Sequence, residues 1–286
     1  MSHLKIIPGH PYTPEQLREI EAHLAGFAGD DRVVPFAEKH AEVLACGDAY
    51  ALATYQFPTL NREVAGFQEG ELVLVSGPTA GGKTLFLQSL HSEFAAAKAP
   101  VVWFSYEVCP RLFFSRFPET PELPEGYLPR ELANNTLPWL YQRIWEAKLK
   151  YNCRVVMIDH LHYIVDMAQL HNPSLQMGAV VRGLKRIAVE LGVIIFLIQH
   201  MREIEPDVEP AMRHIRDTGM SIREADTVLM IWRLSEDEHG LGRAMLKIDK
   251  ARRTGVLGRR VPIIKAGARL VELETKREAE EIRYER

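Results

Sequence analysis

The chain has 286 residues, of which 47% are hydrophobic and 26% are charged, and its formal net charge at pH 7 is −3. This composition provides a core for one large domain or two small ones. It argues against a uniformly basic nucleic-acid-binding protein, while a local basic stripe stays compatible with it. The three cysteines form no C-x-x-C pair, so neither a disulfide framework nor a zinc site is indicated. The start of the chain lacks the apolar stretch of a signal peptide, and no run approaches the roughly 18 apolar residues of a membrane span. We therefore expect a cytoplasmic protein with no membrane partner.

The first part of the chain contains a clear helix start. Thr13 is suited to cap a helix, Pro14 suits its first position, and Gln16 completes a capping box. Apolar residues then recur at helical spacing, which predicts an amphipathic helix over 14–24. Residues 32–56 are expected to be further helix, so that 1–56 form an N-terminal helical extension or linker.

From about residue 57 strand-like and helix-like segments alternate, which predicts an α/β fold with a mostly parallel twisted sheet flanked by helices. The last two strands follow each other closely and predict an antiparallel hairpin. The expected strands are 71–76, 101–105, 154–159, 193–198, 227–232, 244–249 and 260–264, and the expected helices are 83–97, 109–117, 138–150 and 175–191. The proline-rich segment 118–129 is expected to be a loop. This main domain is predicted to span 57–273, and the charged tail 274–286 is expected to be a solvated helix.

The stretch from Gly77 to Thr84 fits the pattern G-x-x-x-x-G-K-[ST] between a strand-like and a helix-like segment. Backbone N–H groups of such a loop surround phosphate oxygens, while Lys83 reaches the β- and γ-phosphates and the Thr84 hydroxyl holds Mg²⁺. The alternative is an ordinary glycine turn. We expect an ATP and Mg²⁺ site whose nucleotide-binding residues are Gly77, Pro78, Thr79, Ala80, Gly81, Gly82, Lys83 and Thr84.

Two acids follow buried strand patterns. Asp159 ends the apolar run 155–158, a Walker B pattern that places its carboxylate beside the phosphate loop as a second Mg²⁺ ligand. Glu107 follows the apolar run 101–106, where it can polarise the attacking water. The alternative for Glu107 is an ordinary helix-start carboxylate.

Two further segments carry candidate residues. Gln199 closes the apolar run 193–198, where its amide can contact the γ-phosphate and sense its loss. The loop that follows, Arg202 to Gly219, is long for a compact domain and is therefore expected to be functional or disordered. The hairpin 244–264 is the most basic region, either as a solvated face or as an arginine finger that reaches a nucleotide on a neighbouring subunit.

Together these stretches resemble the motor domain of the DnaB-type replicative helicases, which is RecA-like. The resemblance runs from about Phe57 to Leu273, and its clearest parts are the phosphate loop, 104–107, 158–162, 183–191, 198–202, 216–226 and 250–252. It implies that Glu107 is the catalytic carboxylate, acting with Lys83 and Gln199, that Arg252 is the finger, and that Lys250 is a companion at the nucleotide.

The resemblance also implies partners. Members of this family form rings, so a hexamer with ATP at subunit junctions is expected, moving along single-stranded DNA in replication. DNA-binding loops would correspond to 166–177 and 202–219, with Arg202, Arg213 and Arg216 as contacts. The helix over 14–24 would be the linker that docks on the adjacent subunit.

The chain departs from the family at several points. Only some 56 residues precede the motor, which suggests a minimal phage- or plasmid-like helicase, acting in a host cytoplasm, with any loader or primase on a separate chain. The loop 203–210 is acidic, which is unfavourable for phosphate contacts. An alternative function is a RecA-like ATPase that serves as a recombination mediator, loader or nucleotide-controlled assembly module without unwinding. A small-molecule kinase is disfavoured because no acceptor pocket motif is present. A metal cluster of His160, His162, His171 and His200 is also disfavoured, because its spacing fits no metal signature.

Overall fold

The structure is a computed structural model that describes residues 12–117, 123–132, 134–164, 173–205, 208–215, 219–234 and 242–273. The chain divides into two compact units, Met1–Asp48 and Ala49–Arg286. The predicted tail 274–286 and the predicted DNA contact Arg216 lie outside the described residues. The domain boundaries expected at 56 and 273 stay predictions.

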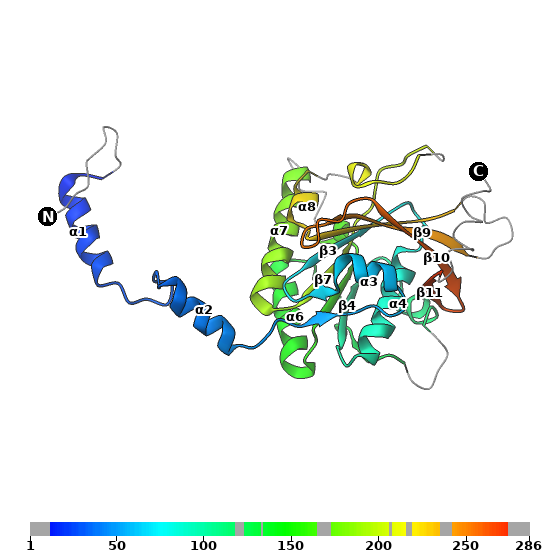
Figure 1. Cartoon of the computed structure of the whole chain (residues 1–286), viewed down its shortest axis with the longest axis horizontal. Helices are drawn as coiled ribbons and strands as arrows, with labels where there is room; N and C mark the ends of the chain where they lie inside the picture. Colours follow the sequence, from blue (N-terminus) through cyan, green and yellow to red (C-terminus); the bar gives the residue numbers. More distant parts are fainter. Residues whose placement is uncertain are drawn as a thin grey trace. The chain divides into compact units, whose positions relative to one another are not determined.

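The first unit contains helices α1 (Pro14–Ala25) and α2 (Phe36–Ala45) (Figure 1). The capping box at α1 is present, since Thr13 Oγ1 accepts a hydrogen bond of 3.3 Å from the Gln16 N–H and Gln16 Oε1 accepts one of 2.8 Å from the Thr13 N–H. The expectation of helix over the whole of 32–56 is wrong, because α2 covers only 36–45. Pro35 precedes its first turn, and Gly47 beyond its end has a φ of 83°, a left-handed conformation that favours glycine.

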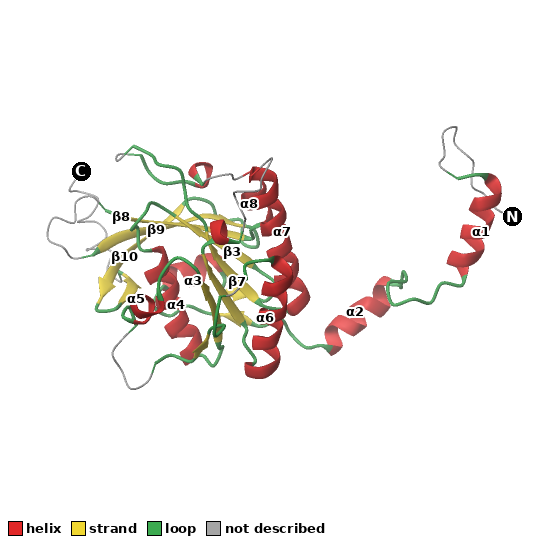
Figure 2. Cartoon of the chain, turned by 180° about the vertical axis from the view of Figure 1, so that it is seen from behind, coloured by secondary structure: helices red, strands yellow, loops and turns green. Residues whose placement is uncertain are grey.

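The second unit is built on a nine-stranded sheet with the order β11-β10-β9-β8-β3-β7-β6-β4-β5 among the described residues. Figure 2 shows strands of this sheet together with the helices around them. The six strands from β8 to β5 are parallel, and β9, β10 and β11 continue the sheet in antiparallel pairs. The strands are β3 (Leu72–Ser76), β4 (Val101–Ser105), β5 (Gly126–Tyr127), β6 (Val155–Asp159), β7 (Ile194–Ile198), β8 (Thr227–Arg233), β9 (Arg243–Ala251), β10 (Arg259–Ala266) and β11 (Arg269–Glu272). A separate two-stranded sheet pairs β1 (Ala51–Leu52) with β2 (Phe67–Gln68).

Helices cover both faces of the large sheet, so its central strands are buried on both sides and their apolar runs are continuous. Val73 and Val75 join one buried cluster with Phe86 of helix α4 (Lys83–Ala96), whereas Leu74 joins a second cluster with Leu140 of helix α6 (Leu137–Tyr151). The alternation follows from the two-residue period of a strand. The described helices of this unit are α3 (Pro58–Val64), α4 (Lys83–Ala96), α5 (Pro110–Phe114), α6 (Leu137–Tyr151), α7 (Pro173–Leu191) and α8 (Gly219–Glu224), with 3₁₀ turns at Leu161–Tyr163 and Met212–His214.

The predicted α/β fold with a mostly parallel sheet and a C-terminal antiparallel hairpin is confirmed. All seven expected strands are present within one to two residues of their predicted ends. The helix expected over 109–117 is shorter, and the segment 118–129 is not entirely loop because Gly126–Tyr127 pair with Val101–Val102. Helices α3 and α8 were not predicted, since they are too short to show a helical period.

Candidate nucleotide-binding site

The phosphate loop joins the end of β3 to the start of α4. At Gly77 the backbone passes so close to β8 that a Cβ there would lie 1.9 Å from the carbonyl oxygen of Ile231, and its φ is 151°. Gly82 has a φ of 99° and precedes Lys83, the first residue of α4. Glycine is therefore required at Gly77 by close approach and favoured at Gly82 by conformation, and together they aim the N-terminus of a 14-residue helix at the loop.

A pocket of about 550 Å³ lies against this loop. Its wall includes Lys83, Thr84 and Glu107, and also three cationic residues that the sequence did not single out as nucleotide ligands: Arg116, Arg233 and Lys265. Lys265 lies near the end of β10, and Gly267 and Ala268 of the turn to β11 also line the pocket. A cluster of cations around a helix N-terminus suits a polyphosphate anion.

Lys83 is buried and already hydrogen-bonded. Its Nζ donates to the carbonyl oxygens of Gly77 (3.0 Å) and Pro78 (2.8 Å), which keeps the side chain folded back along the loop. Burial lowers the pKa of Lys83, and the nearby carboxylates of Glu107 and Asp159 partly oppose that shift. A phosphate group would supply the missing negative charge and favour the charged amine.

Thr84 and Asp159 form the predicted metal-binding pair. Thr84 Oγ1 donates a hydrogen bond of 2.7 Å to Asp159 Oδ2. Asp159 is fully buried at the end of β6, and its Oδ1 has no hydrogen-bond partner among the described residues. Burial raises the pKa of Asp159 to about 6, although the Thr84 hydrogen bond and the charge of Lys83 partly oppose that shift. An orphaned carboxylate oxygen beside a hydroxyl fits Mg²⁺, which prefers oxygen ligands.

Glu107 and Gln199 lie at the same edge of the sheet but in different surroundings. The Glu107 side chain is 40% exposed and forms part of the pocket wall. Gln199 follows β7 and is fully buried, with its backbone N–H donating to Val75 and its carbonyl accepting from the Ser76 hydroxyl at 2.7 Å. Gln199 therefore packs behind the phosphate loop, and its predicted contact with a γ-phosphate stays a prediction.

The structure brings two histidines to Glu107, although sequence spacing showed no such group. Ligand atoms of Glu107, His160 and His200 all lie within 4.8 Å of one another. His160 Nδ1 accepts a hydrogen bond of 3.3 Å from the backbone N–H of His162, so the neutral ring carries its proton on Nε2, which faces Glu107 Oε2 at 3.8 Å. We assign no ion to this cluster. His171 lies outside the described residues.

Arg252 and Lys250 lie at the end of the sheet where the parallel strands β3 and β8 begin, whereas the phosphate loop lies at the end where β3 finishes. Thr227, the first residue of β8, pairs with Ala251 and also lies beside Val73 near the start of β3, whereas the loop follows the end of β3. Lys250 Nζ donates to the carbonyl oxygens of Ile222 and Ala225, both at 2.7 Å. The structure therefore does not bring Arg252 or Lys250 to the nucleotide site of their own chain.

The cations of the hairpin are largely paired with acids. Glu209, from the acidic loop, accepts from Lys247 at 2.9 Å and forms an ion pair with Arg260 at 2.5 Å. Arg253 is paired with Glu71 at 3.2 Å. These cations of the basic hairpin are thus neutralised by nearby carboxylates. Of the predicted DNA contacts, Arg202 and Arg213 have exposed side chains.

Arg202 also lines a second groove, of about 780 Å³, together with residues 78–81 of the phosphate loop and residues 201–205 and 208–210. Its described lining mixes Arg202 and Arg260 with Glu203, Glu205 and Glu209. The groove therefore combines both signs of charge next to the nucleotide site.

A phosphate loop between a buried parallel strand and a helix, with Asp159 on a nearby strand, defines a RecA-like P-loop ATPase domain. Comparison with known protein families identifies a more specific group within this class. Residues 130–263 match the family model of the DnaB-like helicase C terminal domain. The match confirms the resemblance to the DnaB-type helicase motor. No described helix is long and apolar enough to cross a membrane.

Individual proteins with similar sequences also include DnaB helicases. The replicative DNA helicase DnaB of Pasteurella multocida (strain Pm70) is 26% identical over an alignment of 248 residues that covers 71% of this chain and 51% of that protein. DnaB of Rickettsia felis (strain ATCC VR-1525 / URRWXCal2) is 33% identical over 94 residues, 32% of this chain and 19% of that protein. The chain thus spans about half the length of the first of these relatives, and a fifth of the second is aligned.

Two solved structures share the fold. A DnaB-like replicative helicase, described together with its interactions with primase, superposes with a TM-score of 0.68 at 18% identity, covering 90% of this chain and 71% of that one. A second solved structure, which is an ATPase domain, gives a TM-score of 0.67 at 18% identity, covering 83% of this chain and 97% of that one.

Proposed function

We propose that this protein is an ATP-dependent DNA helicase or translocase that acts as a ring, with six subunits as the expected number, on single-stranded DNA in replication. One observation supports an assembly of several copies. Arg252 lies near the start of the parallel strands, whereas the phosphate loop follows the end of β3. A site containing both must therefore combine two copies of the chain. Such a junction places hydrolysis between subunits, where it can change how neighbours grip a strand.

In this proposal the residues of the pocket divide the chemistry of phosphoryl transfer. Lys83 and the backbone N–H groups of the loop bind and orient the β- and γ-phosphates, and Glu107 orients and polarises the attacking water. Thr84 and Asp159 would hold Mg²⁺, which neutralises charge on the phosphate oxygens. Arg252 from the adjacent copy stabilises the charge that develops in the transition state, a contribution of several kcal/mol in comparable sites.

DNA binding is proposed for the exposed arginines of the 202–219 loop, with Arg202 and Arg213 on its described part and Arg216 as a further candidate. Contacts to phosphates are independent of base sequence and weaken as salt rises. A loader or primase on a separate chain is the expected partner, and the expected location is the cytoplasm, or a host cytoplasm if the protein is phage-encoded.

A RecA-like assembly module that hydrolyses ATP without unwinding is the second candidate. The pairing of Lys247, Arg253 and Arg260 with acids favours it, because these cations are then less available to a DNA backbone. Both candidates share the nucleotide site and differ in their response to DNA.

The first experiment measures ATPase rate with and without single-stranded DNA on particles whose mass is known from light scattering. Strong stimulation of a ring-sized particle supports the motor, and a forked-duplex unwinding assay then follows. A ring whose ATPase ignores DNA supports the assembly module. Lys83→Ala is the control, since it must abolish hydrolysis in either case and weaken nucleotide binding.

The finger is tested by mixing subunits. Arg252→Ala keeps its own phosphate loop and Lys83→Ala keeps its own finger, so mixed rings contain junctions with both intact. We expect each variant to be inactive alone and the mixture to regain ATPase activity. A mixture no more active than its components contradicts a finger that acts across the junction.

A further inference from the structure

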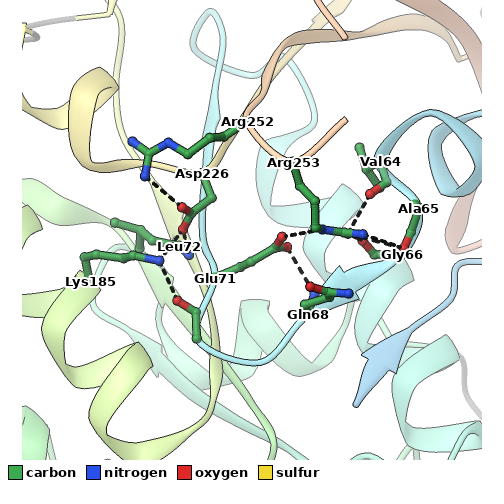
Figure 3. A network of polar contacts seen from close by, with 11 residues as sticks. Val64, Ala65, Gly66, Gln68, Glu71, Leu72, Lys185, Asp226, Arg252 and Arg253 are labelled. Atoms are coloured by element: carbon green, nitrogen blue, oxygen red, sulfur yellow. Dashed lines mark hydrogen bonds and ion pairs between the residues drawn. The ribbon is translucent and has the colours of Figure 1, made fainter. Parts of the chain in front are cut away.

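Asp226 joins three elements at the edge of the sheet that carries Arg252 (Figure 3). Its Oδ1 accepts a hydrogen bond of 3.1 Å from Arg252 Nη1. Its Oδ2 accepts from the backbone N–H of Leu72 at 2.9 Å and from Lys185 Nζ at 2.7 Å. The Asp226 side chain is only 12% exposed. The backbone carbonyl of Asp226 accepts a hydrogen bond of 2.8 Å from the backbone N–H of Arg252. Asp226 thus holds Arg252 through both its side chain and its backbone.

The contact with Leu72 connects this edge to the nucleotide site of the same chain. Leu72 is the first residue of β3, which ends at Ser76, directly before the phosphate loop. Because β3 is paired on both sides, with β7 and β8, and is fully buried, a shift at one end displaces the other end. Lys185 of α7 braces the arrangement, since its Nζ also donates to the Gly70 carbonyl at 2.7 Å.

The neighbouring Arg253 provides an internal contrast. Arg253 is paired with Glu71 and donates to the carbonyl oxygens of Val64, Ala65 and Gly66 at the end of α3, so its guanidinium is committed to holding the fold. Arg252 contacts Asp226 and the Arg223 carbonyl, and its side chain stays 51% exposed. Two adjacent arginines therefore differ: Arg253 is bound to Glu71 and to the backbone at the end of α3, whereas Arg252 is held by Asp226 and stays half exposed. Figure 3 shows both sets of contacts.

We propose that Asp226 is the positioning residue of Arg252, and that it couples the finger to the β3 strand that carries the phosphate loop of the same subunit. Occupancy of one nucleotide site then biases the finger that serves the next site around the ring. This inference rests on the proposed function, because it takes Arg252 to act on the nucleotide of an adjacent copy. Asp226 itself touches no nucleotide in it.

The test is Asp226→Asn, which keeps an oxygen for the Leu72 N–H and removes the charge that holds Arg252. We expect kcat for ATP hydrolysis to fall by about 10–100-fold, as for a misplaced catalytic group, while KM changes less than about threefold because the variant's own phosphate loop is intact. Asp226→Glu keeps the charge but displaces it by one methylene. It guards against a folding defect and is expected to lower kcat as well.

Subunit mixing separates positioning from folding. A mixture of Asp226→Asn and Lys83→Ala subunits should regain activity. In some junctions of the mixed ring, the intact phosphate loop of an Asp226→Asn subunit then meets the correctly positioned Arg252 of a Lys83→Ala neighbour. The matched control is Glu71→Gln, which alters the partner of Arg253 at the same edge and should leave kcat within about twofold of the parent. Ring mass is measured for every variant.

Three results overturn the inference. Asp226→Asn with the parent kcat, while Arg252→Ala is inactive, shows that the finger does not depend on Asp226. A loss of activity that mixing does not restore shows that Asp226 acts on its own subunit's fold. An equal loss in Glu71→Gln shows a general effect of that edge. By contrast, an Arg252→Ala variant with the parent kcat contradicts the finger in the proposed function itself.

Discussion

The Thr84 hydroxyl donates a 2.7 Å hydrogen bond to the Asp159 carboxylate, although 75 residues separate them in the chain. Strand β6 and the start of α4 meet here, and the other carboxylate oxygen has no hydrogen-bond partner among the described residues. Asp159→Asn removes the negative charge and keeps the shape. We expect nucleotide affinity to lose most of its dependence on Mg²⁺, measured by calorimetric titration with and without the metal. Unchanged Mg²⁺ dependence contradicts the assignment.

Glu107→Gln is predicted to bind nucleotide and fail to turn it over. The amide keeps the size of the side chain and cannot accept a proton or orient water as a carboxylate does, so kcat should fall by about 10²–10⁴-fold with little change in nucleotide affinity. Single-turnover hydrolysis and equilibrium binding measure the two quantities. A variant with the parent kcat removes Glu107 from its proposed role.

Gly77→Ala is predicted to destabilise the protein severely. The new Cβ would lie 1.9 Å from the Ile231 carbonyl oxygen, and neither backbone has room to move within the buried sheet. We expect a loss of about 3 kcal/mol or more in the free energy of unfolding, measured by urea titration. Gly219→Ala, where no atom lies within 4 Å of the added carbon, is the control and should change stability by less than about 1 kcal/mol. Equal stability of the two variants contradicts the geometry.

Glu93 predicts a dependence of stability on pH. This buried side chain of α4 accepts a hydrogen bond from the backbone N–H of Gln56, and burial raises its pKa to about 7 from the usual 4.5. A raised carboxyl pKa means that the folded state holds the proton more tightly. The associated stability is present in full below about pH 4.5 and is lost as the pH rises through 7.

Glu93→Gln removes this cost of ionisation while its amide oxygen still accepts from Gln56. We expect the variant to be more stable than the parent by about 1–3 kcal/mol at pH 8, with the difference shrinking as the pH falls to 4.5. Urea unfolding at a series of pH values measures it, and Glu131→Gln, at an exposed position, serves as the control. A difference that does not vary with pH contradicts the burial of the ionised form.

The site could be predicted from the sequence where its parts are contiguous. The phosphate loop is one uninterrupted segment whose residue types are dictated by close backbone approach, as Gly77 against Ile231 illustrates. Asp159 and Glu107 were predictable for a related reason, because carboxyl ends of parallel strands meet at one edge of a sheet. Lys265, near the end of β10, and Arg233, at the end of β8, were missed, since only the tertiary fold brings them to the pocket.

The chain by itself therefore determined the alternation of strands and helices, the phosphate loop and the class of chemistry, because these follow from local spacing and from backbone conformation. Only the tertiary structure decided which charges are neutralised and which are presented. Glu209 reaches Lys247 and Arg260, and Asp226 reaches Leu72, Lys185 and Arg252, across strands that are far apart in the chain. The physical reason is strand order: β3 lies between β8 and β7, and β4 pairs with β6, so residues far apart in the chain become neighbours and the pairing of charges is fixed by topology.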